Sequence, residues 1–215
     1  EGIQKSRRIL SEITKKKIPV VTEFLNPILA SYTKDYITWG VIGSRTSTSQ
    51  IHREFASNQD MPIGFKNPLD GSFDDAINSS LSSRTPQSTI EYDPLNKPYL
   101  TTSPGNNYTH VILRGGYSGT NYHKKDISRL LECQKRRKLR ARVVVDCSHG
   151  NITRNTFDQV SVFKNIIEQI KEGNKEIMGI MIESHIKKNN QCSITDPCID
   201  WQTSLELIKT AHKKL

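Results

Sequence analysis

Residues 142–185, RVVVDCSHGNITRNTFDQVSVFKNIIEQIKEGNKEIMGIMIESH, contain the pattern that decides the fold. The β-branched run Arg142–Asp146 predicts a buried strand, and the apolar spacing over Phe157–Lys171 predicts a helix. A second apolar run, Glu176–Ile182, predicts another strand. Two strands joined by a helix of this length run parallel, with a right-handed crossover. The stretch therefore predicts an α/β fold.

The same alternation of strand and helix extends outward from this stretch. Further strands are expected at Ile18–Phe24, Thr38–Ser44, Pro62–Lys66 and Thr109–Leu113. Further helices are expected at 4–16, at Pro27–Tyr36, from an N-cap at Ser47 or Thr48 to about Ser57, at Ser72–Leu81, at Lys124–Arg137 and at Thr203–Lys214. Residues 82–107 are rich in Ser, Thr, Pro and Asn and predict an inserted loop, in which Thr89–Tyr92 and Tyr99–Thr102 pair as a hairpin. Six repeats without a clear linker predict a single domain over residues 1–215.

The composition limits the kinds of partner. The 215 residues include 31 Lys and Arg against 22 Asp and Glu, a formal net charge of +9. Such a chain favours anionic partners such as nucleic acid, acidic membranes or phosphorylated metabolites, although a uniformly basic surface gives the same total. No apolar run approaches the roughly 20 residues that cross a bilayer, and residues 1–10 do not resemble a signal peptide. Four cysteines without a CxxC pair indicate reduced thiols, so we expect a cytoplasmic protein that does not bind a membrane.

Each of the six predicted strands ends in polar residues. These strand ends are Glu23, Ser44-Arg45, Lys66-Asn67, Arg114-Gly115-Gly116, Asp146-Cys147-Ser148-His149 and Glu183-Ser184-His185. In a (β/α) barrel the carboxyl ends of the strands converge on one face, where barrel enzymes place their chemistry. Strand ends also lie at the surface, where charge is common, so a solvated rim is the alternative. The amino ends of the strands lack a pattern of the same consistency, which favours an active site.

Three of these ends are cationic. Arg45 and Arg114 offer planar guanidinium groups that match phosphate or carboxylate, and Lys66 offers a compact charge. A single cation of this kind is more often a solvated surface residue. Together they indicate a ligand with two or three negative charges, and Gly115-Gly116 allows a close approach of the backbone to it.

A second group of residues has the chemistry of metal ligands. His149, Glu183 and Asp196 offer an imidazole and two carboxylates, a mixed set that suits Mn²⁺, Fe²⁺, Co²⁺ or Zn²⁺. His149 alone reads as a hydrogen-bonded polar residue, and Asp196 alone reads as a turn or cap residue. A metal site is favoured only slightly by these residues taken by themselves.

Other chemistries are poorly supported. Ser148-His149 and Ser184-His185 are adjacent pairs whose side chains point to opposite faces of a strand, and no GxSxG elbow, GxGxxG or P-loop is present. The basic run Lys135–Arg142 lacks interleaved aromatic residues and reads as a solvated helix end. We therefore expect neither a hydrolase nor a nucleic-acid partner.

Six motifs resemble those of type I 3-deoxy-D-arabino-heptulosonate 7-phosphate (DAHP) synthases of the microbial Phe-, Tyr- or Trp-sensitive class. They are GSRTSTSQIHRE at 43–54, PIGFKN at 62–67, ILRGG at 112–116, DCSHGN at 146–151, GIMIESH at 179–185 and SITDPCIDW at 193–201. The resemblance covers essentially the whole chain, with only residues 82–107 matching loosely.

The resemblance implies a (β/α)₈ (TIM) barrel that condenses phosphoenolpyruvate with erythrose 4-phosphate, the first step of the shikimate pathway to aromatic amino acids. It implies a divalent metal ion (Mn, Fe, Co or Zn) and a homodimer or homotetramer. The residues it assigns are Ser44, Arg45, Lys66 and Arg114 for phosphoenolpyruvate, His149, Glu183 and Asp196 for the metal, and Lys66 and Glu23 for catalysis, Glu23 lying near the aldehyde.

The sequence also departs from the family pattern. The family's first strand ends in G-P-C-S, whose Cys is a fourth metal ligand, and its second carries K-P-R-T; neither motif occurs here, so the chain resembles units three to eight. Cys147 reads as a buried core residue in preference to a replacement ligand. The loop Ile186–Cys192 is short, which puts the reach of Asp196 in question. The alternative is a partial DAHP synthase-like chain that binds phosphometabolites or serves in assembly without turnover.

Overall fold

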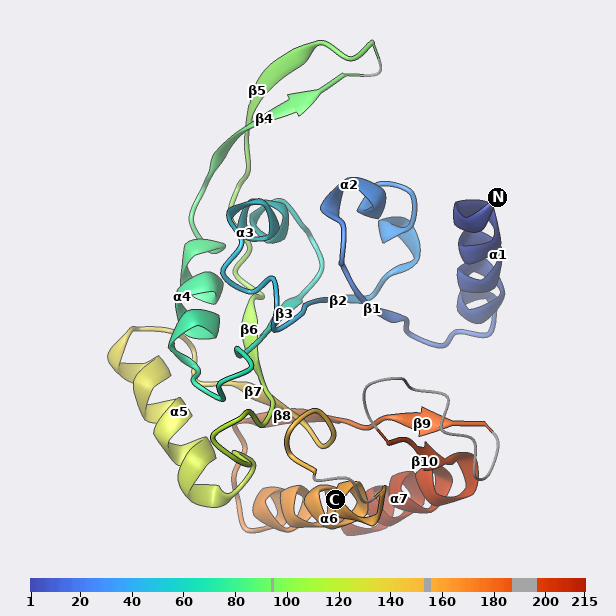
Figure 1. Cartoon of the computed structure of the whole chain (residues 1–215), viewed down its shortest axis with the longest axis vertical. Helices are drawn as coiled ribbons and strands as arrows, with labels where there is room; N and C mark the ends of the chain where they lie inside the picture. The colour runs from blue at the N-terminus through green and yellow to red at the C-terminus, as the bar shows by residue number, and fades with distance from the viewer. Residues whose placement is uncertain (94, 153–155, 187–196) are drawn as a thin grey trace. The chain divides into compact units, whose positions relative to one another are not determined.

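The computed structural model describes residues 1–93, 95–152, 156–186 and 197–215. They form two compact units of strands and helices, whose elements are labelled in Figure 1. Unit 1 comprises Glu1–Lys66 and Asp74–His110, and unit 2 comprises Asn67–Phe73 and Val111–Leu215. Within the described ranges, no helix has the length and apolar character needed to cross a membrane.

Unit 1 is built on three short parallel strands, β1 (Val21–Glu23), β2 (Trp39–Ile42) and β3 (Ile63–Lys66). β2 pairs with both of the others, in the order β1-β2-β3. The side chains of Ile42, Ile63 and Phe65 are fully buried, as expected for parallel strands covered on both faces. The helical elements of the unit are α1 (Gly2–Lys15), α2 (Pro27–Ala30), the 3-10 turn η1 (Lys34–Tyr36), α3 (Gln50–Ser57) and α4 (Asp74–Ser82).

An antiparallel hairpin follows α4. It consists of β4 (Ser88–Tyr92) and β5 (Pro98–Thr102), with Ile90 opposite Leu100, and it lies where the sequence predicts the inserted hairpin. Figure 1 shows the hairpin extending beyond α3 and α4. A single domain over residues 1–215 with this insertion remains a prediction.

Unit 2 repeats the parallel arrangement with β6 (His110–Leu113), β7 (Val143–Asp146) and β8 (Ile177–Met181) in the order β6-β7-β8. Its helices are α5 (Lys124–Arg136), α6 (Thr156–Lys171) and α7 (Trp201–Lys214). α6 packs against α7 and β8, around a core that includes Phe163, Ile167 and Leu207. A short parallel pair, β9 (Ser184–His185) with β10 (Ile199–Asp200), was not predicted from the sequence.

The α/β prediction is confirmed, since all six expected parallel strands occur. Two helix predictions were wrong. The helix expected at Pro27–Tyr36 is interrupted, because Thr33 takes φ −136° and the Tyr32 and Thr33 N–H groups donate to the carbonyls three residues earlier, as in turns. The N-cap of α3 was predicted at Ser47 or Thr48, but it is Ser49. The residues before it form a turn in which the Ser49 N–H donates to the Thr46 carbonyl (3.0 Å).

Candidate functional site

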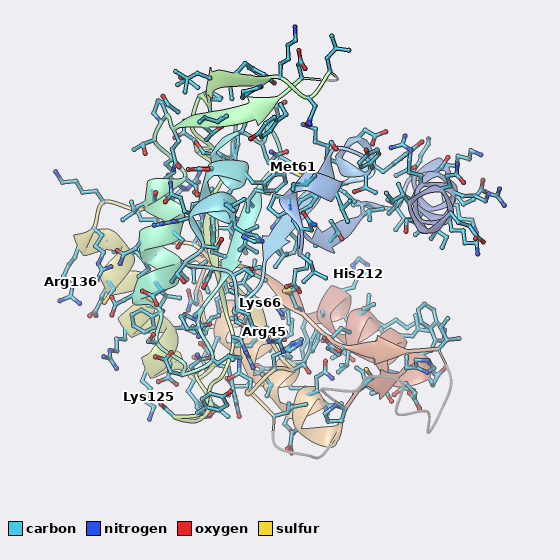
Figure 2. The ribbon with its side chains drawn as sticks, turned by 45° about the horizontal axis from the view of Figure 1, so that its top comes forward. Arg45, Met61, Lys66, Lys125, Arg136 and His212 are labelled. Atoms are coloured by element: carbon cyan, nitrogen blue, oxygen red, sulfur yellow. The ribbon has the colours of Figure 1, made fainter. Side chains whose placement is uncertain are left out.

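The predicted site residues of unit 1 lie at the carboxyl ends of its strands. Glu23 is the last residue of β1 and Lys66 the last of β3, while Ser44 and Arg45 follow β2 after Gly43. Because the three strands are parallel and paired, these ends share one edge of the sheet. Figure 2 labels the Arg45 and Lys66 side chains. The structure therefore brings together the four site residues that the sequence predicts in this unit.

Glu23 and Gly43 are in direct contact at this edge. A Cβ atom on Gly43 would lie 2.0 Å from Oε1 of Glu23, so the carboxylate occupies the space that a side chain would need. The Phe24 N–H donates to the Val41 carbonyl (2.9 Å), which keeps the chain beside β2 just beyond Glu23. Gly43 thus lets a carboxylate lie next to the segment that carries Arg45.

The two cations of unit 1 differ in exposure. The Lys66 side chain is buried, with 7% of its surface exposed, whereas Arg45 is exposed to solvent. A buried ammonium group is unfavourable unless it has polar partners. The edge therefore presents one cation held within the protein and one that a ligand can reach.

His52, for which no role was predicted from the sequence, joins α3 to the loop that follows Glu23. Its Nδ1 lies 2.9 Å from Oγ of Ser49, and its Nε2 lies 3.3 Å from the Leu25 carbonyl. A carbonyl only accepts, so Nε2 donates to Leu25 and Nδ1 accepts from the Ser49 hydroxyl. α3 is thereby joined to the loop after β1.

In unit 2, asparagine side chains hold the backbone of Arg114 at both of its polar groups. The Arg114 N–H donates to Oδ1 of Asn67 (2.6 Å), and its carbonyl accepts from Nδ2 of Asn121. The N–H of Asn121 in turn donates to Oδ1 of Asn151 (2.8 Å), and all three asparagines are buried. The guanidinium Nε of Arg114 donates to the His149 carbonyl (3.1 Å). Arg114 is thus a cation in a fixed place.

The glycines after Arg114 lie close to the backbone of other loops. A Cβ atom on Gly115 would lie 2.0 Å from the carbonyl oxygen of Gly150, and one on Gly116 would lie 2.2 Å from the nitrogen of Gly71. The turn after β6 is thus packed against the turn after β7 through Gly115 and against the loop that contains Gly71 through Gly116. The close approach of a ligand to this backbone remains a prediction.

Asp146, the last residue of β7, orients His149. Its Oδ2 lies 2.9 Å from Nδ1 of His149, and its Oδ1 accepts from the Ser148 N–H (2.9 Å). Asp146 is 1% exposed, so this carboxylate is held in a low-dielectric environment where such contacts are strong. A carboxylate beside Nδ1 places the proton there and leaves the Nε2 lone pair available, as in histidines that bind metals. Asp146 is among the polar strand-end residues predicted from the sequence, but its role in orienting His149 was not predicted.

Nε2 of His149 lies 3.3 Å from Oε1 of Glu183. At this separation either a proton on Nε2 or a cation beside the pair offsets the repulsion of the two lone pairs, and both atoms are of kinds that bind divalent metals. Asp196, the third predicted ligand, lies outside the described residues. Among the residues that the structure describes, no group of three or more His, Cys, Asp and Glu side chains is arranged to hold a metal.

Cys147 is a core residue. It is fully buried and packs with Ile152, Phe163 and Leu207, and burial raises the pKa of its thiol, with the charge of Asp146 adding to the effect. The chain turns after Asp146, so the strand alternation that would place Cys147 and His149 on one face does not extend this far. The structure therefore supports the core role of Cys147 over a ligand role.

The fold and the charged strand ends of each unit define the chain as a protein of the (β/α)-barrel class. A family model described as the DAHP synthetase I family matches residues 1–214, and the chain belongs to this family. The chain is 37% identical over 226 residues to the Tyr-sensitive phospho-2-dehydro-3-deoxyheptonate aldolase of Salmonella typhimurium, a match that covers 100% of this chain and 63% of that protein. It is 34% identical over 223 residues to the tyrosine-inhibited phospho-2-dehydro-3-deoxyheptonate aldolase of Schizosaccharomyces pombe, covering 97% of this chain and 60% of that one.

A solved structure agrees with this assignment. The phospho-2-dehydro-3-deoxyheptonate aldolase of Francisella tularensis SCHU S4 matches 99% of this chain and 65% of its own chain, with a TM-score of 0.91 and 35% identity. The predicted (β/α)₈-barrel class and the predicted family are therefore confirmed. The chain spans between 60% and 65% of the length of these three relatives.

Proposed function

We propose that this chain acts as a DAHP synthase, which joins phosphoenolpyruvate to erythrose 4-phosphate. The observation that carries the proposal is the pairing of Nε2 of His149 with Oε1 of Glu183 at 3.3 Å, with Nδ1 of His149 taken up by Asp146. Imidazole and carboxylate both bind divalent metals, and a carboxylate on the second ring nitrogen is the usual partner of a metal-binding histidine. Family membership and the names of the relatives support the same reaction.

The cations are proposed to bind phosphoenolpyruvate. Arg45, Lys66 and Arg114 would neutralise its phosphate and carboxylate, with the backbone of Ser44 as a further contact. Neutralisation lets a second phosphorylated substrate approach the same place, and fixed positions reduce the entropy lost when two substrates react. Burial of Lys66 and the hydrogen bond from the Arg114 backbone to Asn67 limit the freedom that these two residues lose when the substrate binds.

His149 and Glu183, with Asp196, are proposed to hold a divalent ion, Mn, Fe, Co or Zn. When bound, this ion supplies Lewis-acid polarisation of the aldehyde of erythrose 4-phosphate. Carbon 3 of phosphoenolpyruvate forms the new bond to the aldehyde carbon, water adds at carbon 2, and the bond from carbon 2 to the phosphate oxygen breaks. Glu23, held beside Gly43, is proposed to lie near the aldehyde, and Lys66 near the reacting end of phosphoenolpyruvate.

The proposal is tested by turnover. The native polypeptide is incubated with phosphoenolpyruvate, erythrose 4-phosphate and Mn²⁺, and release of inorganic phosphate and formation of DAHP are measured. Turnover that His149→Ala abolishes, together with its affinity for Mn²⁺, is the expected result. Unchanged Mn²⁺ affinity in His149→Ala overturns the ligand assignment, and binding of phosphoenolpyruvate without turnover supports a non-catalytic member of the family. A cytoplasmic homodimer or homotetramer remains the predicted setting.

A further inference from the structure

Glu183 lies beyond the regular part of its strand. The last residue of β8 is Met181, whose carbonyl accepts from the Cys147 N–H (2.9 Å) and closes the pairing with β7. The peptide groups of Glu183 are therefore not held by the β7–β8 pairing. A metal ligand in this position needs another source of rigidity, because a misplacement of about 1 Å already impairs a functional site.

Gln159 of α6 provides that rigidity. Its Oε1 accepts from the Glu183 N–H (2.5 Å), and its Nε2 donates to the Glu183 carbonyl (3.2 Å). A primary amide has the donor and the acceptor of a peptide group, so the Gln159 side chain takes the place of a neighbouring strand. The same Glu183 carbonyl also accepts from the Ile199 N–H (3.0 Å), which joins it to the start of β10.

The burial of Gln159 shows that this contact is specific. Its side chain is fully buried, whereas 31% of the Glu183 side chain is exposed at the strand end. A buried amide is retained only where both of its polar atoms find partners, since an unsatisfied one is strongly unfavourable. The two bonds to Glu183 satisfy both polar atoms of the amide.

We infer that Gln159 is a positioning residue for the metal ligand Glu183, acting through the backbone and not touching the metal or the substrates. The inference rests on the proposed function, since it takes Glu183 as a ligand. The consequence is that α6, an outer helix of unit 2, sets the distance between the Glu183 carboxylate and the His149 imidazole. Metal affinity should then depend on a residue that carries no metal donor.

The chain contains a matched control in Gln134 of α5. Its Nε2 donates to the Arg142 carbonyl (2.9 Å) and its Oε1 accepts from the Arg142 N–H (3.2 Å), and it too is fully buried. Gln134 therefore bonds the N–H and carbonyl of one residue, as Gln159 does. Its partner Arg142 precedes β7 and lies at the opposite end of that strand from His149. Gln134 therefore reports what the loss of such a contact does to stability alone.

The test compares Gln159→Met with Gln134→Met in the native polypeptide, using methionine because it keeps length and volume while removing both hydrogen bonds. Both variants are expected to lower Tm by about 2–10 °C without metal, since each removes two buried hydrogen bonds from the amide side chain. Only Gln159→Met is expected to raise the Kd for Mn²⁺, measured by calorimetry, by about 10–100-fold. Gln159→Asn keeps the amide on a side chain one methylene shorter and serves as the second variant if Gln159→Met fails to fold, with an intermediate loss of affinity expected.

The outcomes distinguish a failure of the positioning role of Gln159 from a failure of the proposed metal site. A Kd for Mn²⁺ that stays within about twofold of wild type in a folded Gln159 variant overturns the positioning role. The assignment of the metal site still stands in that case if His149→Ala loses Mn²⁺ binding. An equal loss of affinity in Gln134→Met also overturns it, because the effect would then be one of general stability. A wild-type protein that binds no Mn²⁺ overturns both the metal site and the role of Gln159.

Discussion

Oδ2 of Asp146 lies 2.9 Å from Nδ1 of His149, and the other ring nitrogen of His149 lies 3.3 Å from Glu183. The buried carboxylate thus decides which nitrogen of the imidazole faces outward. Asp146 ends a strand and His149 follows three residues later in a turn, so a local contact converts a strand end into an oriented donor.

Asp146→Asn is expected to weaken Mn²⁺ binding by about 10–100-fold. The amide has a single acceptor oxygen and no negative charge, so it cannot accept from both the Ser148 N–H and Nδ1 of His149. Calorimetric titration with Mn²⁺ measures the change. Asp60→Asn, at an exposed loop residue of unit 1, removes one negative charge and should leave Kd unchanged. Equal affinities in wild type and Asp146→Asn would show that the carboxylate does not orient His149.

Gly115→Ala is expected to destabilise the protein by about 3 kcal/mol or more, because its Cβ would lie 2.0 Å from the Gly150 carbonyl and a backbone atom cannot move aside cheaply. Gly179→Ala in β8 is the matched control, since its Cβ would meet the nearest atom of Val144 at 3.8 Å, an ordinary contact. Denaturant unfolding of both variants gives the two free energies. Similar values for the two would contradict the close packing of the two turns.

Arg114→Ala is expected to weaken phosphoenolpyruvate binding by about 10–100-fold, which corresponds to losing one charged hydrogen bond or two. Titration with phosphoenolpyruvate measures it. Lys125→Ala removes the same charge from an exposed position on α5, labelled in Figure 2, and should change the affinity by less than about twofold. If both variants bind equally weakly, the attraction comes from net charge and Arg114 is not a specific contact.

Cys147 is expected to resist alkylation in the native protein. Burial raises the pKa of its thiol above the usual range, so at pH 8 the reactive thiolate is almost absent and the reagent has no access. Cys133, which is partly exposed on α5, should react before Cys147. Mass spectrometry of iodoacetamide-treated protein, native and unfolded, distinguishes the two residues, and early labelling of Cys147 would argue against its place in the core.

Prediction from sequence succeeded where the information is local. The strand over Arg142–Asp146 and the helix after it follow from apolar periodicity, which reflects burial on one or two faces of an element. The ends of elements were less well predicted, as with the interrupted helix after Pro27, because caps and turns depend on single hydrogen bonds. The candidate ligands His149 and Glu183 were named from their residue types at strand ends.

The sequence by itself determined the α/β class, the family and the identities of the strand-end residues, since spacing and motif are properties of consecutive residues. Only the tertiary structure decided how those residues are held. Gln159 meets Glu183 across 24 positions, and Asn67 meets Arg114 across 47. A buried amide that is polar in sequence reads as a surface residue until its distant partner is known, because its hydrogen bonds are satisfied only when the chain brings the two together.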